Sequence, residues 1–198
     1  MDYKKLTLYF VLVISLVISF IYDKQIYLYL IQFKLPFFNY FFLIIHWLGT
    51  GYGVFVLATL LFMKKRSKLS LLWLSFFSAL AITGILKYTV LRPRPHLVLG
   101  VVALITKDSP AFPSGHTTSA FSVVPLIFKN FRYMKCIWLI FALLVAYSRV
   151  YIGIHYLSDV LGGVIIGLFF GDLYLYLEKK YKLTKHINKK WSLKNIFK

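Results

Sequence analysis

The sequence predicts an all-α integral membrane protein in which six transmembrane helices form one domain. Three observations support this. Of 198 residues, 60% are hydrophobic and 15% are charged, which lies outside the usual composition of soluble domains. The apolar residues gather in runs near the length of about 17 to 25 residues that crosses a bilayer as a helix. Short basic runs separate them, as in loops held on the cytoplasmic side of a membrane.

Three long apolar runs predict the first three spans. Residues 6–22 come after Lys4 and Lys5 and have the look of a signal peptide, but the following SFIYDKQ offers no small-residue cleavage site, so we expect a retained anchor. Residues 37–63 and 70–91 are each long enough to cross the hydrocarbon core. The basic run KKRSK separates these two spans.

The last three spans lie at 114–129, 135–152 and 157–178. The fourth span is short and the fifth contains Arg149 near its end, so the assignment of both rests partly on the adjacent spans. Together the spans give a single membrane domain, residues 1–178. The remaining residues, 179–198, form a basic tail that we expect in the cytoplasm, in water or against anionic headgroups.

The distribution of basic residues sets the expected orientation. With a cytoplasmic amino terminus, 17 of the 24 Lys and Arg residues fall in cytoplasmic segments, as the positive-inside rule requires. The net charge of +18 then reflects topology, and no nucleic-acid partner is expected. We expect a multi-pass protein of the cytoplasmic (inner) membrane, with both termini in the cytoplasm and the lipid bilayer around it.

Three polar stretches emerge at the opposite, external face: KYTVLRPRP at 87–95, PSGH at 113–116 and SRVYIGIHYLSD at 148–159. They bring together the cations Lys87, Arg94 and Arg149, with Asp108 and Asp159 as nearby carboxylates. Cations at membrane depth are costly and usually serve a function. An arginine fork binds two oxygens of a phosphate and a lysine a third, so the excess charge indicates a phosphate site.

The PSGH stretch suits the same anion. Ser114 at a helix start presents its hydroxyl together with the free N–H groups and positive dipole of the first turn. Gly115 lets that backbone approach closely. His155 lies four residues before Asp159, one helical turn apart, so the carboxylate can fix the imidazole tautomer and leave the other nitrogen as a nucleophile. His116 then serves as the acid for the leaving-group oxygen.

These residues resemble the type-2 phosphatidic acid phosphatase superfamily, whose signature is K-x6-RP, then PSGH, then SR-x5-H-x3-D. Every specified position is filled in order, across roughly residues 84–160. The resemblance implies the helical core of that superfamily and a phosphohistidine mechanism without a metal or other cofactor. In it, His155 resembles the nucleophile, Asp159 its orienting partner and His116 the general acid. The phosphate-binding set it implies is Lys87, Arg94, Ser114, Gly115 and Arg149.

Several residues outside the signature carry open alternatives. Arg92 and His96 are candidates for contact with a second phosphate or a headgroup, and equally for solvated loop residues. His46 is interpreted as a helix-packing residue. The apolar run at 96–105 either lies in the membrane interface beside the site or packs on the helix ends.

The expected function is a membrane lipid phosphatase that hydrolyses a phosphate monoester or diphosphate of a lipid at the extracytoplasmic face. Candidate substrates are undecaprenyl diphosphate, phosphatidylglycerol phosphate or phosphatidic acid, and the 1-phosphate of lipid A. A phosphotransferase and a non-catalytic lipid-binding or transport protein are the alternatives. The sequence leaves the oligomeric state open.

Overall fold

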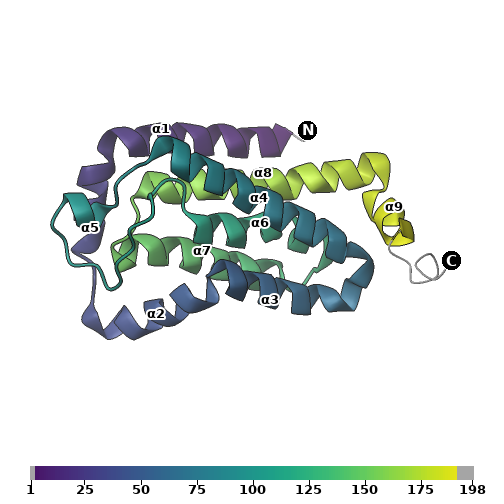
Figure 1. Ribbon diagram of the computed structural model, residues 1–198, viewed down its shortest axis with the longest axis horizontal. Coiled ribbons are helices and arrows are strands. Elements are labelled where there is room, and N and C mark those ends of the chain that lie inside the picture. Colours follow the sequence, from purple (N-terminus) through teal and green to yellow (C-terminus); the bar gives the residue numbers. More distant parts are fainter. Residues whose placement is uncertain (1–2, 191–198) are drawn as a thin grey trace.

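The computed structural model of the protein describes residues 3–190, which form helices and contain no strand (Figure 1). In chain order the elements are α1 (Tyr3–Ile31), η1 (Pro36–Phe38), α2 (Asn39–Leu48), α3 (Gly51–Phe62), η2 (Met63–Lys68), α4 (Leu69–Val90), α5 (Pro95–Val98), α6 (Gly115–Asn130), α7 (Lys135–Ile152), α8 (Leu157–Tyr181) and α9 (Leu183–Lys190). The all-α membrane fold is confirmed.

The prediction of six separate spanning helices is wrong in its count. Within residues 3–190, four stretches are long and apolar enough to cross a membrane: Tyr3–Ile31, Gly51–Val98, Lys135–Ile152 and Leu157–Tyr181. The expected span at 37–63 is divided, because α2 ends at Leu48 and the Thr50 side chain caps α3, accepting a hydrogen bond from the N–H of Gly53 at 3.0 Å. The expected span at 114–129 is α6, and its 16 residues are fewer than a typical span has.

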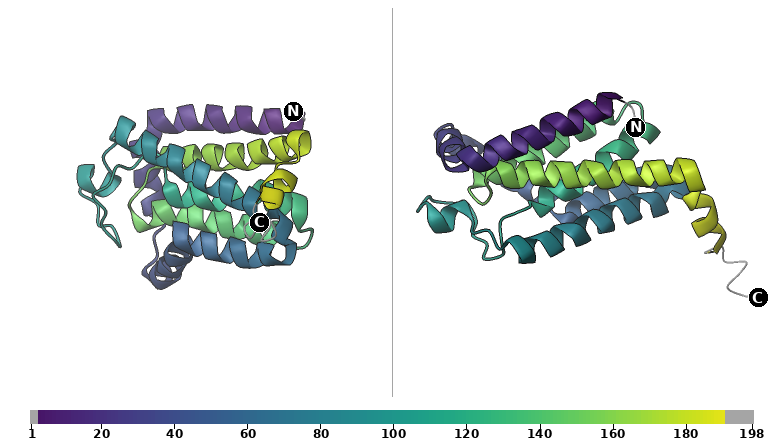
Figure 2. Two further views of the ribbon diagram at one scale, coloured as in Figure 1. Left: turned by 45° about the vertical axis from the view of Figure 1, so that its right-hand side comes forward. Right: turned by 90° about the horizontal axis from the view of Figure 1, so that it is seen from above.

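The helices lie along one long axis, so their connections gather at two ends (Figures 1 and 2). The start of α1, the turn η2 and the end of α8 lie at one end. The short helix α5, the loop at 99–113 and the start of α8 lie at the other. The three polar stretches therefore share one end of the bundle, and most of the basic runs share the opposite end.

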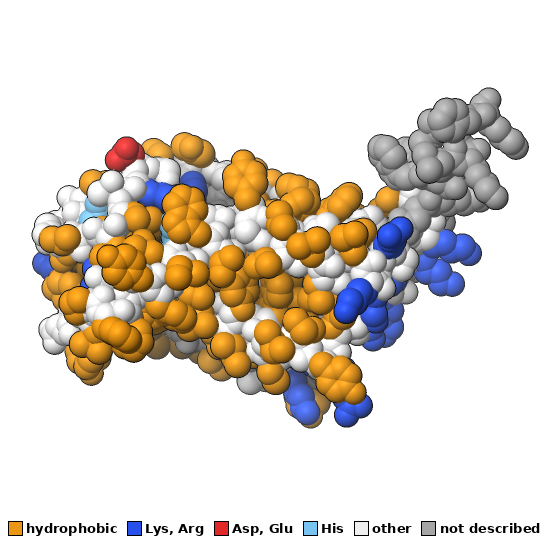
Figure 3. Space-filling view, turned by 90° about the horizontal axis from the view of Figure 1, so that it is seen from below, with side chains coloured by type: hydrophobic (Ala, Val, Ile, Leu, Met, Phe, Trp, Pro, Cys, Tyr) orange, Lys and Arg blue, Asp and Glu red, His pale blue; other side chains and the backbone are white. Residues whose placement is uncertain are grey.

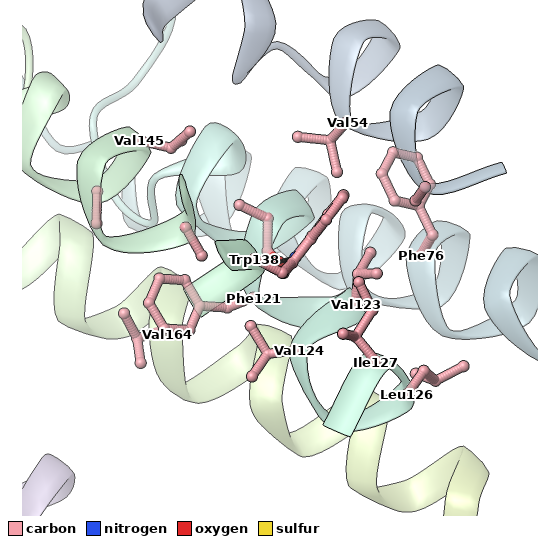
Figure 4. Packing of buried hydrophobic residues seen from close by; sticks show 14 of the residues in the cluster. Val54, Phe76, Phe121, Val123, Val124, Leu126, Ile127, Trp138, Val145 and Val164 are labelled. Carbon is pink, nitrogen blue, oxygen red and sulfur yellow. Dashed lines mark hydrogen bonds between the residues drawn. The ribbon is translucent and has the colours of Figure 1, made fainter. Parts of the chain in front are cut away.

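Helix α6 is the centre of the bundle, with every residue from Thr117 to Ile127 buried. Figure 4 shows its apolar side chains among Val54 of α3, Phe76 of α4, Trp138 of α7 and Val164 of α8. The neighbours of α6 are protein rather than lipid, so it can carry Ser and Thr. Their polar atoms bond inside the bundle, as where the hydroxyl of Ser75 on α4 donates to the carbonyl of Ser122 at 3.0 Å.

Close contact between α6 and α8 depends on a row of glycines four residues apart on α8: Gly163, Gly167 and Gly171. A Cβ at Gly167 would lie 2.7 Å from the carbonyl oxygen of Thr118, and one at Gly163 would lie 2.7 Å from that of Ser114. Small residues at this spacing let two helix backbones approach within a membrane. The row thus fixes the start of α6 against α8, where the polar stretches meet.

The surface agrees with a membrane location. Hydrophobic side chains cover much of the face seen in Figure 3, and Lys and Arg gather at the end where α8 ends. The first residues of the expected tail at 179–198 are helical, because α8 continues to Tyr181 and α9 packs against α4 and η2. Residues 191–198 of that tail lie outside the described residues.

Candidate active site

The residues of the three polar stretches converge at the end of the bundle that carries α5. Lys87 lies in the last turn of α4, Arg149 in the last turn of α7 and Asp159 in the first turn of α8. Ser114 is the N-cap of α6, and its backbone N–H donates to the carbonyl of Asp159 at 2.9 Å. The starts of α6 and α8 are therefore joined directly.

His155 lies in the short turn between α7 and α8 and is only 3% exposed. Its Nδ1 is 3.3 Å from Oδ2 of Asp159, and its Nε2 is 3.1 Å from Nη1 of Arg94. Asp159 is held in turn by the backbone N–H of Tyr156, which donates to Oδ2 at 2.9 Å. One imidazole nitrogen thus faces the carboxylate and the other faces the cations.

Arg94 and Lys87 also hold the loop that covers this end. The Arg94 Nε donates to the carbonyl of Ser109 at 2.6 Å, and its Nη1 donates to the carbonyl of Ile154 at 2.8 Å. The Lys87 ammonium donates to the carbonyl of Pro110 at 2.5 Å. These cations bond to neutral carbonyls, so their charge is not cancelled and remains available to an anion.

Ser114 is fully buried and Gly115 opens α6 with its Cβ position clear, the nearest atom being 3.8 Å away on Thr83. The Ser114 hydroxyl accepts from the hydroxyl of Thr117 at 3.0 Å. Nε2 of His116 is buried and has no hydrogen-bond partner among the described residues. This nitrogen is therefore available to bond with a ligand atom.

Two residues that complete the site were not assigned to it from the sequence. His46 of α2 accepts from Nη1 of the fully buried Arg149 at 2.5 Å through Nδ1, and its ring stacks on His116 with centroids 4.9 Å apart at 18°. Its interpretation as a packing residue is therefore incomplete. Asp23 of α1 is buried and accepts from the Ser158 hydroxyl and from the Ser158 N–H at 3.2 Å. An ionisable residue within an expected span, as for His46, or directly after one, as for Asp23, is the signal that could have drawn attention to both.

Arg92 is not a solvated loop residue, because its guanidinium pairs with two carboxylates. Its Nη1 donates to Oδ1 of Asp159 at 2.9 Å, and its Nη2 donates to Oδ2 of Asp23 at 2.6 Å. Its guanidinium also lies 4.3 Å from the centre of the Tyr156 ring. Arg92 is thus the bridge between two carboxylates, because both lie where its fork can reach them.

The apolar run at 96–105 is bonded to the end of α7 and also leaves apolar side chains exposed. The N–H of Leu104 donates to the carbonyl of Ile152 at 2.9 Å, while Val98 and Val102 remain 57% and 86% exposed. His96, in α5, has both ring nitrogens buried and without a hydrogen-bond partner among residues 3–190. The described contacts connect His96 to no residue of the site.

Electrostatics at this end favour a neutral nucleophile and a bound anion. Burial, followed by the charges of Arg94, Lys87 and Arg149, holds the pKa of the His155 imidazole well below its usual range. Lys107, on the covering loop, adds to this effect. Burial, and then the charges of Arg94 and Arg149, lower the pKa of Lys107 itself. Like charges held together in this way are stabilised by a bound phosphate.

The chain is similar in sequence to known proteins. The sequence pattern of the PAP2 superfamily matches residues 68–182. The undecaprenyl-diphosphatase BcrC of Bacillus subtilis is 33% identical over 130 residues, 63% of this chain and 66% of the relative. Phosphatidylglycerophosphatase B of the same organism is 32% identical over 140 residues, 65% of this chain and 67% of the relative. A lipid A 4'-phosphatase of Porphyromonas gingivalis is 39% identical over 77 residues, 35% of this chain and 32% of the relative. The chain spans about two thirds or less of the length of these curated relatives.

Two solved structures share the fold. The crystal structure of a PAP2 type phosphatidylglycerolphosphate phosphatase from Bacillus subtilis superposes with a TM-score of 0.74 at 26% identity, covering 90% of this chain and 98% of that one. Aquifex aeolicus LpxE gives a TM-score of 0.72 at 29% identity, covering 78% and 94%.

Proposed function

Because the chain belongs to the PAP2 superfamily of metal-independent membrane lipid phosphatases, we propose that it hydrolyses a phosphate monoester or diphosphate of a lipid through a phosphohistidine intermediate. One observation carries the proposal: His155 is held between Asp159 on one nitrogen and the cation Arg94 on the other. This arrangement orients a neutral nucleophile toward a phosphate bound among the cations.

In the first step, Nε2 of His155 attacks phosphorus and the bond from phosphorus to the lipid oxygen breaks. His116 gives a proton to that oxygen, so the lipid leaves as an alcohol or, from a diphosphate, as a monophosphate. In the second step, water attacks phosphorus, the phosphorus–nitrogen bond breaks and His116 takes the proton from water. Inorganic phosphate is released and both histidines return to their starting states.

The cations act on the charge that develops in these steps. A phosphate oxygen replaces Nε2 of His155 as the acceptor for Arg94, while Lys87, Arg149 and the N–H groups at Gly115 bind the remaining oxygens. Donors fixed before the reaction stabilise the transition state without reorganising during it, and loss of one commonly costs roughly 3 to 4 kcal/mol of barrier. The hydrogen bonds from Arg94 to Ser109 of the covering loop and to Ile154, just before α8, supply that fixed position.

We place the site at the extracytoplasmic face, with both termini in the cytoplasm. The basic runs and the site lie at opposite ends of the bundle, and Lys and Arg favour the cytoplasmic side. In this arrangement α2 and α3 cross together and α6 crosses at the centre of the bundle, where protein surrounds it. The proposed substrates are undecaprenyl diphosphate, phosphatidylglycerol phosphate or phosphatidic acid, and the 1-phosphate of lipid A, the first two supported by the undecaprenyl and phosphatidylglycerol relatives.

The test is phosphate release by the purified protein in detergent with a chelator present, from these lipids and from a soluble phosphate ester. We expect chelator-resistant release from at least one lipid and its loss in His155→Ala. A matched control is Arg132→Ala, an exposed cation at the opposite end. Transfer of labelled phosphate to another lipid or sugar would favour the phosphotransferase alternative. No release and no transfer by folded protein would favour lipid binding or transport.

A further inference from the structure

The end of the bundle opposite His155 and Asp159 has a cavity that the proposed catalytic steps do not use. A cavity of about 1100 Å³ opens there between α1 and α8, with the end of α6 and the start of α4 contributing to its wall. Figure 2, in the view from above, shows α1 and α8 drawing apart toward the start of α1. The cavity is therefore a gap between two membrane helices, and it opens where both reach the bilayer surface.

The wall of the cavity is apolar and its rim is basic. The apolar lining residues are Tyr9, Leu71, Phe169, Leu173, Leu175 and Tyr176. The lysines that line it are Lys5, Lys68, Lys129, Lys179 and Lys180. An apolar wall beneath a cluster of lysines matches a phospholipid, whose chain takes the wall and whose headgroup takes the cations.

The carboxylates of the cavity are already engaged. Asp172 pairs with Lys5 and accepts from the Tyr9 hydroxyl at 3.1 Å. Glu178 accepts from Lys68 at 2.7 Å and also from Thr184. These contacts hold α1 and α9 against α8, and they pair both carboxylates of the cavity with lysines.

Three cations of the rim are not paired with a carboxylate in the described part of the chain, and one of them, Lys180, has its Nζ 5.0 Å from the centre of the Tyr181 ring. Lys129, at the end of α6, and Lys179 and Lys180, at the end of α8, have no carboxylate partner among residues 3–190. We propose that this cavity binds an anionic phospholipid, its phosphate between these three lysines and one acyl chain along Phe169 and Leu173. The bound lipid fills the gap between α1 and α8.

The cavity lies far from the proposed catalytic residues. Lys179 and Lys180 lie in the last turn of α8 and Asp159 lies in its first turn, at opposite ends of a 25-residue helix. Helix α1 connects the two ends, since Lys5 reaches the cavity and Asp23 reaches Ser158 and Arg92. A lipid that holds α1 against α8 therefore supports the placement of Asp23 as well.

The test measures binding directly, so its result is independent of whether the protein hydrolyses lipids. Phosphatidylglycerol or phosphatidylcholine is added to the protein in nonionic detergent, and bound lipid is counted by native mass spectrometry alongside thermal unfolding. The variant Lys129→Gln/Lys179→Gln/Lys180→Gln neutralises the rim. The control Lys64→Gln/Arg66→Gln/Arg132→Gln removes the same charge from exposed positions at the same end, outside the cavity.

We expect phosphatidylglycerol to bind and raise the unfolding temperature, and the rim variant to weaken this binding about tenfold or more relative to the control. Leu173→Trp, which fills the cavity without changing charge, should also lower phosphatidylglycerol binding. Equal losses in the rim and control variants would mean general attraction to a basic surface and would overturn the proposal. Equal binding of phosphatidylcholine would overturn it too.

Discussion

Replacing His46 tests how the site is organised. His46 makes two separable contacts, a hydrogen bond from Arg149 at 2.5 Å and a ring stack on His116 with centroids 4.9 Å apart. His46→Phe keeps an aromatic ring for the stack and removes the acceptor. His46→Asn keeps an acceptor close to the position of Nδ1 and removes the stack. The pair of variants therefore assigns the effect to one contact or the other.

The magnitude follows from the charge on Arg149. A hydrogen bond to a charged group contributes about 1.5 to 3 kcal/mol, and Arg149 is fully buried, so no water is at hand to replace the lost acceptor. If Arg149 must be held in place for phosphate binding in the transition state, that energy corresponds to a fall of about 10- to 100-fold in kcat/KM. We expect this fall in His46→Phe and a much smaller one in His46→Asn.

The assay is steady-state phosphate release from the preferred lipid in mixed micelles, with thermal unfolding to show that both variants are folded. A positioning role for His46 predicts that the loss appears mainly in kcat, because Arg149 acts most strongly on transition-state charge. If His46→Phe retains wild-type kcat while His46→Asn is impaired, the ring stack matters and the hydrogen bond does not. That result would refute the reasoning from Arg149.

Three further predictions concern the nucleophile, α1 and the helix packing. Burial and nearby cations lower the pKa of His155, so its imidazole stays neutral as the pH falls to 6.5. The acid limb of the pH profile of kcat/KM should therefore lie below pH 6.5. A midpoint above that value would contradict the neutral nucleophile. Asp23→Asn leaves Arg92 without one of its two carboxylates. It should lower the unfolding free energy, measured by chemical denaturation, by about 1 to 3 kcal/mol and should also lower activity. Unchanged stability would speak against the bridge that Arg92 makes between Asp23 and Asp159. Gly167→Ala should cost about 1 to 3 kcal/mol, since its Cβ has no room, whereas Gly84→Ala, with nothing within 4 Å, should be neutral or stabilising. Equal thermal unfolding of the two glycine variants would contradict close α6–α8 packing.

The candidate site was largely predictable because its residues sit at helix ends. Lys87, Ser114 and Asp159 each lie within a turn of where a helix begins or ends, so the expected topology alone placed them at one face. Asp23 and His46 were not predictable in this way. Each is a single polar residue in the first quarter of the chain, far in sequence from the residues it contacts, and only tertiary structure shows the partner.

The fold was predictable in class and less so in detail. Hydropathy averages apolar content over a window, and the run at 37–63 is predominantly apolar. The average therefore does not register the break that Thr50 makes by capping α3. Hydropathy also assumes that a spanning helix meets lipid. Helix α6 meets protein on every side of its middle turns, and this explains why a short helix with several Ser and Thr residues can lie at the centre.

The charges around the proposed phosphate site explain why Arg92 is paired with carboxylates. Asp159 must accept from His155 through one oxygen, and its second oxygen, if unpaired, would attract Arg94 or Lys87 and reduce the charge they offer to a phosphate. Arg92 occupies that second oxygen at 2.9 Å, and Asp23 occupies the other side of the Arg92 fork at 2.6 Å. Arg92 therefore occupies the Asp159 oxygen that would otherwise draw in a second cation, and Lys87 and Arg94, bonded to neutral carbonyls, stay available to substrate.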